Sequence, residues 1–203
     1  MEPDTYPPGT VRALLQTDLV TPRTRAALLP RLERGEAAPR FFDGPAFALL
    51  RAVCARLIPQ PGAAPPLDIA GNIDERLAQG KGDGWRYDAL PPDGEAYRQG
   101  LQGLDESAHM RHGVGFVTLE GPQQDELLCA VQRGAASGDV WKTLSGPRFF
   151  EELLAEAAEC YYSDPMSQEE IGYAGMADAR GWLRIGLDQR EPHEPQAREG
   201  THG

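Results

Sequence analysis

Two histidines three residues apart are the side chains most suited to metal chemistry. His109 and His112 fall on one face of a predicted helix, with Asp105 one turn earlier. A catalytic zinc ion needs about three protein ligands and a structural one about four. The two other histidines, His193 and His202, lie in the polar C-terminal tail. A metal-dependent enzyme using Asp105, His109 and His112 therefore stays an alternative rather than the main interpretation.

Other motifs give little support for catalysis. The segment GKGDG from Gly80 lacks the third glycine of a dinucleotide-binding loop, because Trp85 stands there. Cys160 lies between Glu159 and Tyr161, and neither neighbour would stabilise a thiolate. No cysteine pair followed by histidine is present to attach haem. The sequence thus predicts no catalytic residue and no metal or cofactor ligand in this chain.

Adjacent carboxylates also fail to form an acid/base pair. Glu151 with Glu152, and Glu169 with Glu170, are neighbours in sequence, and such neighbours on a helix do not face each other across a substrate. We expect them to form solvated acidic surface. Glu156 is expected on the same polar side of its helix.

Glycine–proline pairs mark where three helices begin. Gly44-Pro45, Gly121-Pro122 and Gly146-Pro147 each precede a helical pattern, and proline in the first turn sacrifices no hydrogen bond. Apolar residues then recur at helical spacing, as Phe47, Leu50, Cys54, Leu57 and Ile58, as Leu127, Leu128 and Val131, and as Phe150, Leu153, Leu154, Ala157 and Tyr161.

Two further helices are predicted. One contains the stripe Tyr97, Leu101, Leu104 and Ala108, and its Gly100 and Gly103 should let another backbone approach closely. The other begins at Thr21-Pro22 and should be broken or kinked at Pro30.

The chain is therefore predicted to be all-α: a single helical domain of five or six helices over residues 1–188, with a polar, flexible tail at 189–203. Long Gly/Pro-rich loops are expected at 59–66 and 79–94. The only candidate strand is short, at 182–186. The C-terminal segment is expected to be irregular and aromatic.

Composition limits the partners and the compartment. The 203 residues carry a net charge of -11 without a basic run, so nucleic acid is not an expected partner. No apolar run approaches the roughly 20 residues of a membrane span, so direct membrane insertion is not expected. The start, MEPDTYPPG, shows no export signal, which predicts a cytoplasmic protein, or a periplasmic one if the signal has been removed. Three widely spaced cysteines do not suggest a disulfide scaffold.

The aromatic segment after the last predicted helix is the best candidate for a binding surface. Tyr and Trp are enriched at protein interfaces, where they bury much area and keep a polar contact, although the same rings could instead complete the chain's own core. The predicted partner interface comprises Tyr161, Tyr162, Asp164, Pro165, Ile171, Gly172, Tyr173, Gly175, Gly181 and Trp182.

With these blocks in view, the chain resembles the gluconate 2-dehydrogenase subunit 3 family from Phe41 to about Asp188. The similarity rests on ordered blocks: FFDGPAFALLRAVCARLIP, NIDERL, AYRQGLQGLDESA, FVTLEGPQQDELLCAVQRG, FFEELLAEAAECYYSDP and EEIGYAGMADARGWLRIG. One departure is Cys160, where the family often has glycine.

The resemblance implies a non-catalytic small subunit of an oxidoreductase complex. Its implied partner is a flavoprotein of the glucose-methanol-choline type, which carries FAD and oxidises a sugar, sugar acid or glycoside. In many such complexes a cytochrome c subunit accepts the electrons. The small subunit is implied to assist folding, stability or export of the flavoprotein. The alternative from a different class is a freestanding helical interaction module.

Overall fold

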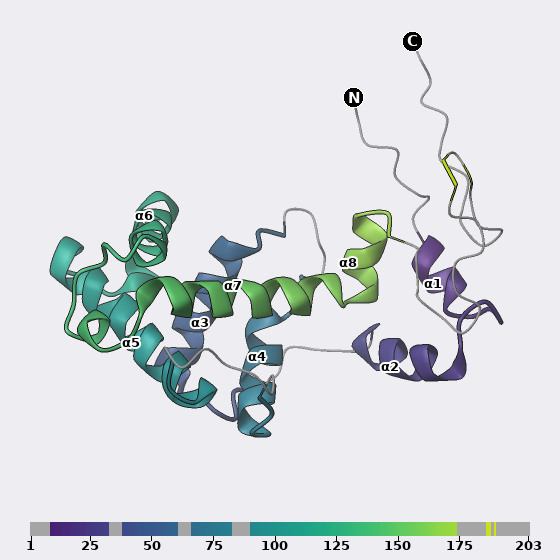
Figure 1. Ribbon diagram of the computed structural model, residues 1–203, viewed down its shortest axis with the longest axis horizontal. Helices are drawn as coiled ribbons and strands as arrows, with labels where there is room; N and C mark the ends of the chain where they lie inside the picture. The colour runs from purple at the N-terminus through teal and green to yellow at the C-terminus, as the bar shows by residue number, and fades with distance from the viewer. Residues whose placement is uncertain are drawn as a thin grey trace, which may run out of the picture. The chain divides into compact units, whose positions relative to one another are not determined.

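The computed structural model describes residues 9–32, 38–60, 66–82, 90–173, 186–187 and 189, and every regular element in these ranges is helical (Figure 1). This confirms the predicted all-α class. The described elements are α1 (Thr10–Leu14), α2 (Pro22–Leu32), α3 (Gly44–Leu57), α4 (Ile69–Ala78), α5 (Asp93–His112), η1 (Phe116–Thr118), α6 (Gly121–Gln132), η2 (Val140–Lys142), α7 (Gly146–Tyr162) and α8 (Pro165–Glu170).

The described residues form eight α-helices, where the sequence predicted five or six. Three of them were not assigned from the sequence: α1, α4 and α8. α1 and α8 have only five and six residues, too few for a clear helical period, whereas the ten residues of α4 were quoted only as the NIDERL block. Residues 61–65 and 83–89 of the predicted loops, and 182–185 of the predicted strand, lie outside the described residues.

Backbone contacts group the chain into two compact units. We call Glu36–Tyr161 the helical body, and Met1–Gly35 together with Tyr162–Gly203 the terminal unit. Each is described separately below. The predicted domain of residues 1–188 and its tail remain predictions.

In the helical body, the three glycine–proline pairs begin helices as predicted. Asp43 caps α3 by accepting a hydrogen bond of 2.9 Å from the backbone N–H of Ala46. At α6, Glu120 and Gln123 form a reciprocal capping box. Because proline already lacks the N–H that a first turn leaves unpaired, these starts are fixed by local sequence.

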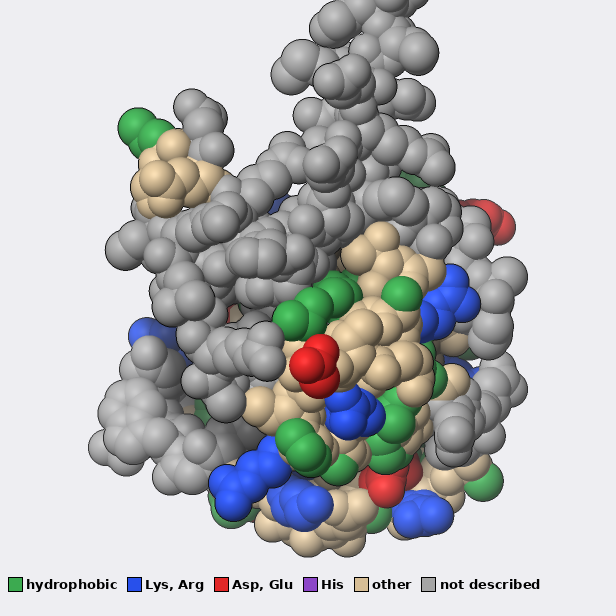
Figure 2. All heavy atoms as spheres, turned by 90° about the vertical axis from the view of Figure 1, so that its right-hand side faces the viewer, with side chains coloured by type: hydrophobic (Ala, Val, Ile, Leu, Met, Phe, Trp, Pro, Cys, Tyr) green, Lys and Arg blue, Asp and Glu red, His purple; other side chains and the backbone are tan. Residues whose placement is uncertain are grey.

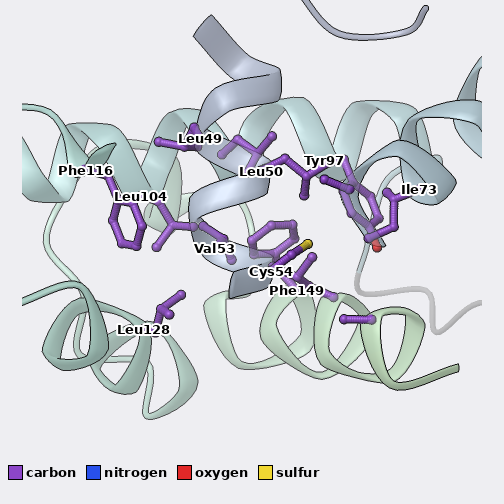
Figure 3. Close-up of a cluster of buried hydrophobic side chains, with 14 of the residues drawn as sticks. Leu49, Leu50, Val53, Cys54, Ile73, Tyr97, Leu104, Phe116, Leu128 and Phe149 are labelled. Carbon is purple, nitrogen blue, oxygen red and sulfur yellow. The ribbon is translucent and has the colours of Figure 1, made fainter. Parts of the chain in front are cut away.

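The core of the helical body forms around α3, which contacts α4, α5, α6 and η1. Figure 3 shows side chains of α3 meeting those of the neighbouring helices in this core. The predicted stripes supply most of it, which confirms their helical phase. Its most deeply buried large residues include Leu50, Val53, Ile73, Leu104, Phe116, Val131, Leu144, Phe149 and Leu153.

Gly100 and Gly103 of α5 do allow a close approach, but by aromatic rings rather than by a backbone. A Cβ added at Gly100 would overlap the ring of Phe149, and one added at Gly103 would lie 2.7 Å from the Trp141 ring. The indole N–H of Trp141 donates a 2.9 Å hydrogen bond to Ser107 Oγ. The two glycines therefore form the slots that seat these rings against α5.

A polar cluster joins α4, α5 and α7 inside the helical body. Arg76 binds both carboxylate oxygens of Glu156, one at 2.7 Å, and Asp93 at 2.8 Å. The Tyr97 hydroxyl donates to the same Glu156 carboxylate. Burial, followed by the nearby Glu156 charge, raises the pKa of Tyr97 well above its ordinary value. Glu156, expected on the solvated side, is instead an internal ligand of Arg76, because its position borders the apolar stripe.

Asp74 is a second internal carboxylate that the sequence did not reveal. It is almost completely buried and accepts backbone N–H groups from Arg40, Phe41 and Phe42 at 2.6, 3.1 and 2.9 Å. These bonds fix the chain leading into α3 onto α4. The NIDERL block thus contains two side chains, Asp74 and Arg76, that hold α4 to neighbouring segments.

The terminal unit has its own small core of Leu15, Val20 and Leu28. The Arg25 guanidinium donates to backbone carbonyls that follow α1, including Leu15 at 2.6 Å and Val20 at 3.0 Å. The α2 helix begins at Pro22 as predicted and passes through Pro30 to Leu32, which corrects the expected break. Pro30 falls in the last turn, where few later hydrogen bonds depend on it.

Candidate functional site

The segment predicted to be an irregular coil contains a helix. α7 ends at Tyr162, and α8 begins after two residues, at Pro165. Asp164 caps α8 by accepting the backbone N–H groups of Met166 at 2.8 Å and Ser167 at 3.4 Å. The Asp–Pro pair was interpreted only as a stop for the preceding helix. The same pair also fits the cap and first position of a new one.

Gly172 ends α8 in a Schellman motif. The Tyr173 N–H donates to the Gln168 carbonyl at 2.8 Å, and the Gly172 N–H donates to the Glu169 carbonyl at 3.2 Å. This turn requires the positive φ of 71° that Gly172 adopts. Gly172, predicted as an interface residue, thus forms the turn at the end of α8, and the motif fixes where Tyr173 leaves the helix.

Four large apolar side chains of this region are exposed: Tyr162 by 53%, Met166 by 45%, Ile171 by 49% and Tyr173 by 47%. We call these four residues the α8 surface. They all belong to the terminal unit. Exposed tyrosines of this kind suit a protein interface, since each ring can bury apolar area while its hydroxyl keeps a hydrogen bond.

The other predicted interface residues have different environments. Tyr161 is buried and packs in the core of the helical body. Asp164 and Pro165 are also buried, the first as the cap of α8. Gly175, Gly181 and Trp182 lie outside the described residues. Met166 was missed, because its segment was interpreted as coil and was therefore given no helical face.

Glu169 on α8 holds α1. Its Oε1 accepts the Gly9 N–H at 2.5 Å and an Arg12 guanidinium N–H at 2.9 Å, while Oε2 receives weaker bonds at 3.4 Å from the Arg12 backbone and side chain. The carboxylate is only 9% exposed, so the expectation of a solvated acidic pair is corrected for Glu169. Its neighbour Glu170 is exposed. This contact could not be predicted from local sequence patterns, because the partners are 157 residues or more apart.

The pKa of Glu169 is set by opposing effects. Burial alone would raise it, but the hydrogen bond from Arg12, the backbone N–H groups of Gly9 and Arg12, and the Arg12 charge together lower it below the ordinary value. The carboxylate is therefore ionised at neutral pH.

A second link joins α2 to the start of α8. The Arg31 guanidinium donates a 2.5 Å hydrogen bond to the Ser163 carbonyl, immediately before the Asp164 cap. On the side where Figure 1 places α1 and α2, Figure 2 shows hydrophobic side chains interspersed with Lys and Arg and few acidic ones. α2 itself carries three arginines and no acidic residue.

Another exposed apolar group lies in the helical body, between α5 and α6. Met110 is exposed by 64%, Val114 by 41% and Val117 by 51%. It contains no aromatic ring, and for that reason the α8 surface is the stronger candidate. The Met110 group provides a matched control for it.

The structure brings together only two of the three candidate metal ligands, since Asp105 Oδ2 lies 3.4 Å from His109 Nδ1. The His109 ring nitrogen Nδ1 lies 2.9 Å from the Asp105 carbonyl in its own helix, and Asp105 Oδ1 accepts the Phe116 N–H at 2.8 Å. Across the described ranges, no three His, Cys, Asp or Glu side chains are grouped as metal ligands. Asp105 instead connects α5 to η1.

Cys54, Cys129 and Cys160 all lie in the described ranges, and none of them forms a disulfide. Burial raises the pKa of Cys54, so this thiol stays protonated at neutral pH. Cys160 is partly buried and packs against the core, in agreement with its interpretation as a packing residue. Cys129 on α6 is exposed.

None of the helices in the described part of the chain is both long enough and apolar enough to cross a bilayer. The fold and the α8 surface thus define a helical protein whose most prominent surface feature is an exposed aromatic group. The sequence profile of the family described as "Gluconate 2-dehydrogenase subunit 3" matches residues 45–185. The chain belongs to this family, and so to the class of accessory subunits of a dehydrogenase complex. Neither the curated proteins nor the solved structures contain a match to the chain.

Proposed function

We propose that this chain is a non-catalytic subunit that binds and stabilises the catalytic flavoprotein of a sugar-oxidising dehydrogenase. The observation that carries the proposal is the exposed α8 surface, with two half-exposed tyrosines, inside the part of the chain that the subunit family matches. FAD and the residues that remove hydride belong to the partner, a flavoprotein of the glucose-methanol-choline type. A cytochrome c subunit is a further proposed member of the complex.

The side chains of the described residues support a binding rather than a catalytic role. Arg76, Asp93 and Glu156 satisfy one another inside the helical body, and Asp74 is used by backbone N–H groups. The strongest polar clusters are therefore occupied with holding helices together. By contrast, the α8 surface leaves apolar area in water, which a partner could cover.

Co-expression with a flavoprotein of the glucose-methanol-choline type from the same organism tests the proposal. Tyr162→Ala and Tyr173→Ala should each weaken copurification of the flavoprotein by about tenfold in affinity, the loss typical of an interface hot spot. Met110→Ala removes a similarly exposed apolar side chain outside the α8 surface and should have no effect. The flavoprotein obtained with wild-type chain should hold more FAD than flavoprotein expressed alone.

Two results would contradict the proposal. One is a flavoprotein that folds, binds FAD and turns over equally well without this chain. The other is an equal loss of binding for Met110→Ala and the α8 variants, which would place the interface elsewhere. A chain that is stable, monomeric and without a flavoprotein partner would support the alternative of a freestanding interaction module.

A further inference from the structure

We infer that α1 and α2 act as an intramolecular strap that orders α8, and thereby sets how strongly the α8 surface binds its partner. The strap consists of residues 9–32. This inference rests on the proposed function for its binding consequence, while the ordering of α8 can be measured in the chain alone.

α8 cannot be stable by itself. It has six residues, well below the roughly 12 to 15 that an isolated helix needs in water. Asp164 and Gly172 satisfy its two ends, but caps alone do not compensate for the cost of starting a helix. The conformation of α8 must therefore depend on packing against other elements.

The strap contacts supply that packing at both ends of α8. Arg31 of α2 holds the Ser163 carbonyl just before the helix. In the last turn, Glu169 is held by Gly9 and Arg12 at the start of α1. Both α1 and α2 contact α8 along the backbone. The strap thus fixes the position and the rotation of α8 within the terminal unit.

This rotation decides which side chains meet the solvent. Met166 and Glu170, one turn apart, are exposed, whereas Ser167 is buried and the Glu169 carboxylate is almost covered. The Glu169 contacts with α1 hold α8 in the rotation in which Met166 faces the solvent. Loss of the Glu169 contacts would free α8 to rotate or unfold, and would scatter the members of the α8 surface.

The strap also lies outside the stretch that the family profile matches. The match covers residues 45–185, which include α8 but neither α1 nor α2. In this chain, the affinity of the α8 surface for its partner would thus depend on residues 9–32. These residues lie outside the region that the family profile matches, and they need not contact the partner.

Hydrogen exchange on the full chain, alone and with the co-expressed flavoprotein, tests the strap. Glu169→Ala removes the acceptor for Gly9 and Arg12. Glu159→Ala is the control, since it removes the same charge and side chain from an exposed position of α7. The amides of Gln168, Ile171 and Tyr173 report on α8, because each donates a backbone hydrogen bond there.

We expect Glu169→Ala to lose about tenfold in protection of these amides and a similar factor in affinity for the flavoprotein. Amides of α3 should keep their protection, which would show that the helical body is intact. Glu159→Ala should leave protection and affinity unchanged.

Unchanged protection of the α8 amides in Glu169→Ala would overturn the inference that the strap orders α8, regardless of the affinity measured for the flavoprotein. Lost protection with unchanged affinity would overturn its link to binding. Unchanged affinity in Tyr162→Ala and Tyr173→Ala, by contrast, would overturn the proposed interface and leave the ordering of α8 by the strap intact. The two failures are therefore distinguishable.

Discussion

The ring of Phe149 on α7 occupies the space that a side chain at Gly100 on α5 would fill. A Gly100→Ala substitution gains helix propensity worth about 1 kcal/mol, but it forces a buried ring out of its place. Such overpacking costs about 1 to 3 kcal/mol. We expect a net loss of up to about 2 kcal/mol in the free energy of unfolding, measured by urea denaturation.

Gly44→Ala is the matched control for this change. A Cβ at Gly44 would meet nothing within 4 Å, so stability should be unchanged or slightly higher. Equal effects of the two substitutions would show that the Phe149 slot does not matter for stability.

Glu156→Ala should strongly destabilise the helical body. It leaves the Arg76 guanidinium and the Tyr97 hydroxyl without their carboxylate partner in a largely buried site. Removing one partner of a buried ion pair typically costs about 3 to 5 kcal/mol, and the remaining Asp93 contact should keep the loss near 3 kcal/mol. Thermal or urea unfolding measures it. Glu159→Ala, on the exposed side of α7, should change stability by less than about 0.5 kcal/mol.

Gly172 should tolerate few replacements. Its φ of 71° is open to glycine, is tolerated by asparagine and is strained for alanine. We expect Gly172→Ala to weaken α8 by about 1 kcal/mol and Gly172→Asn by less. Exchange of the Tyr173 amide, which closes the Schellman motif, reports on this directly. Equal exchange in both variants would contradict the role of the positive φ.

The contribution of Glu169 should depend on pH. Its pKa is lower in the folded chain than the ordinary 4.5. The stabilisation is therefore fully present above the unfolded pKa, and it is lost as the pH falls through the folded one. At pH 7, Glu169→Gln should reduce the stability of the terminal unit by about 1 kcal/mol, since it keeps an acceptor but loses the charge facing Arg12. The difference should vanish well below pH 4.5. A constant difference across this range would show that the charge does not contribute.

Local patterns predicted most of the helical body. The glycine–proline starts and the apolar stripes depend on neighbours in the chain, and the structure confirms them. The helical spacing also distinguishes the two tyrosines at the end of α7. Tyr161 belongs to a predicted apolar stripe and is buried, whereas Tyr162 lies outside the stripe and is exposed. The interface prediction grouped both tyrosines by residue type alone.

Long-range partners explain what the sequence did not reveal. Glu156 meets Arg76 across 80 residues, and Asp74 meets Arg40 across 34. The residues next to each carboxylate in the sequence are typical of a protein surface. Only the tertiary fold therefore distinguishes these internal carboxylates from solvated ones. The same holds for Glu169. The α8 helix was not predicted for a different reason: the single Asp164-Pro165 pair both ends one helix and begins the next.

The pairing of α1 with α8 has a consequence for synthesis on the ribosome. Arg12 leaves the exit tunnel long before Glu169, its partner 157 residues later. Helices of the body have all their partners by Tyr161, so they can fold while translation continues. α1 and α2 emerge before the helical body, but their contacts with α8 can form only after α8 has been synthesised. In the order of synthesis, the terminal unit is thus begun before the helical body and completed after it.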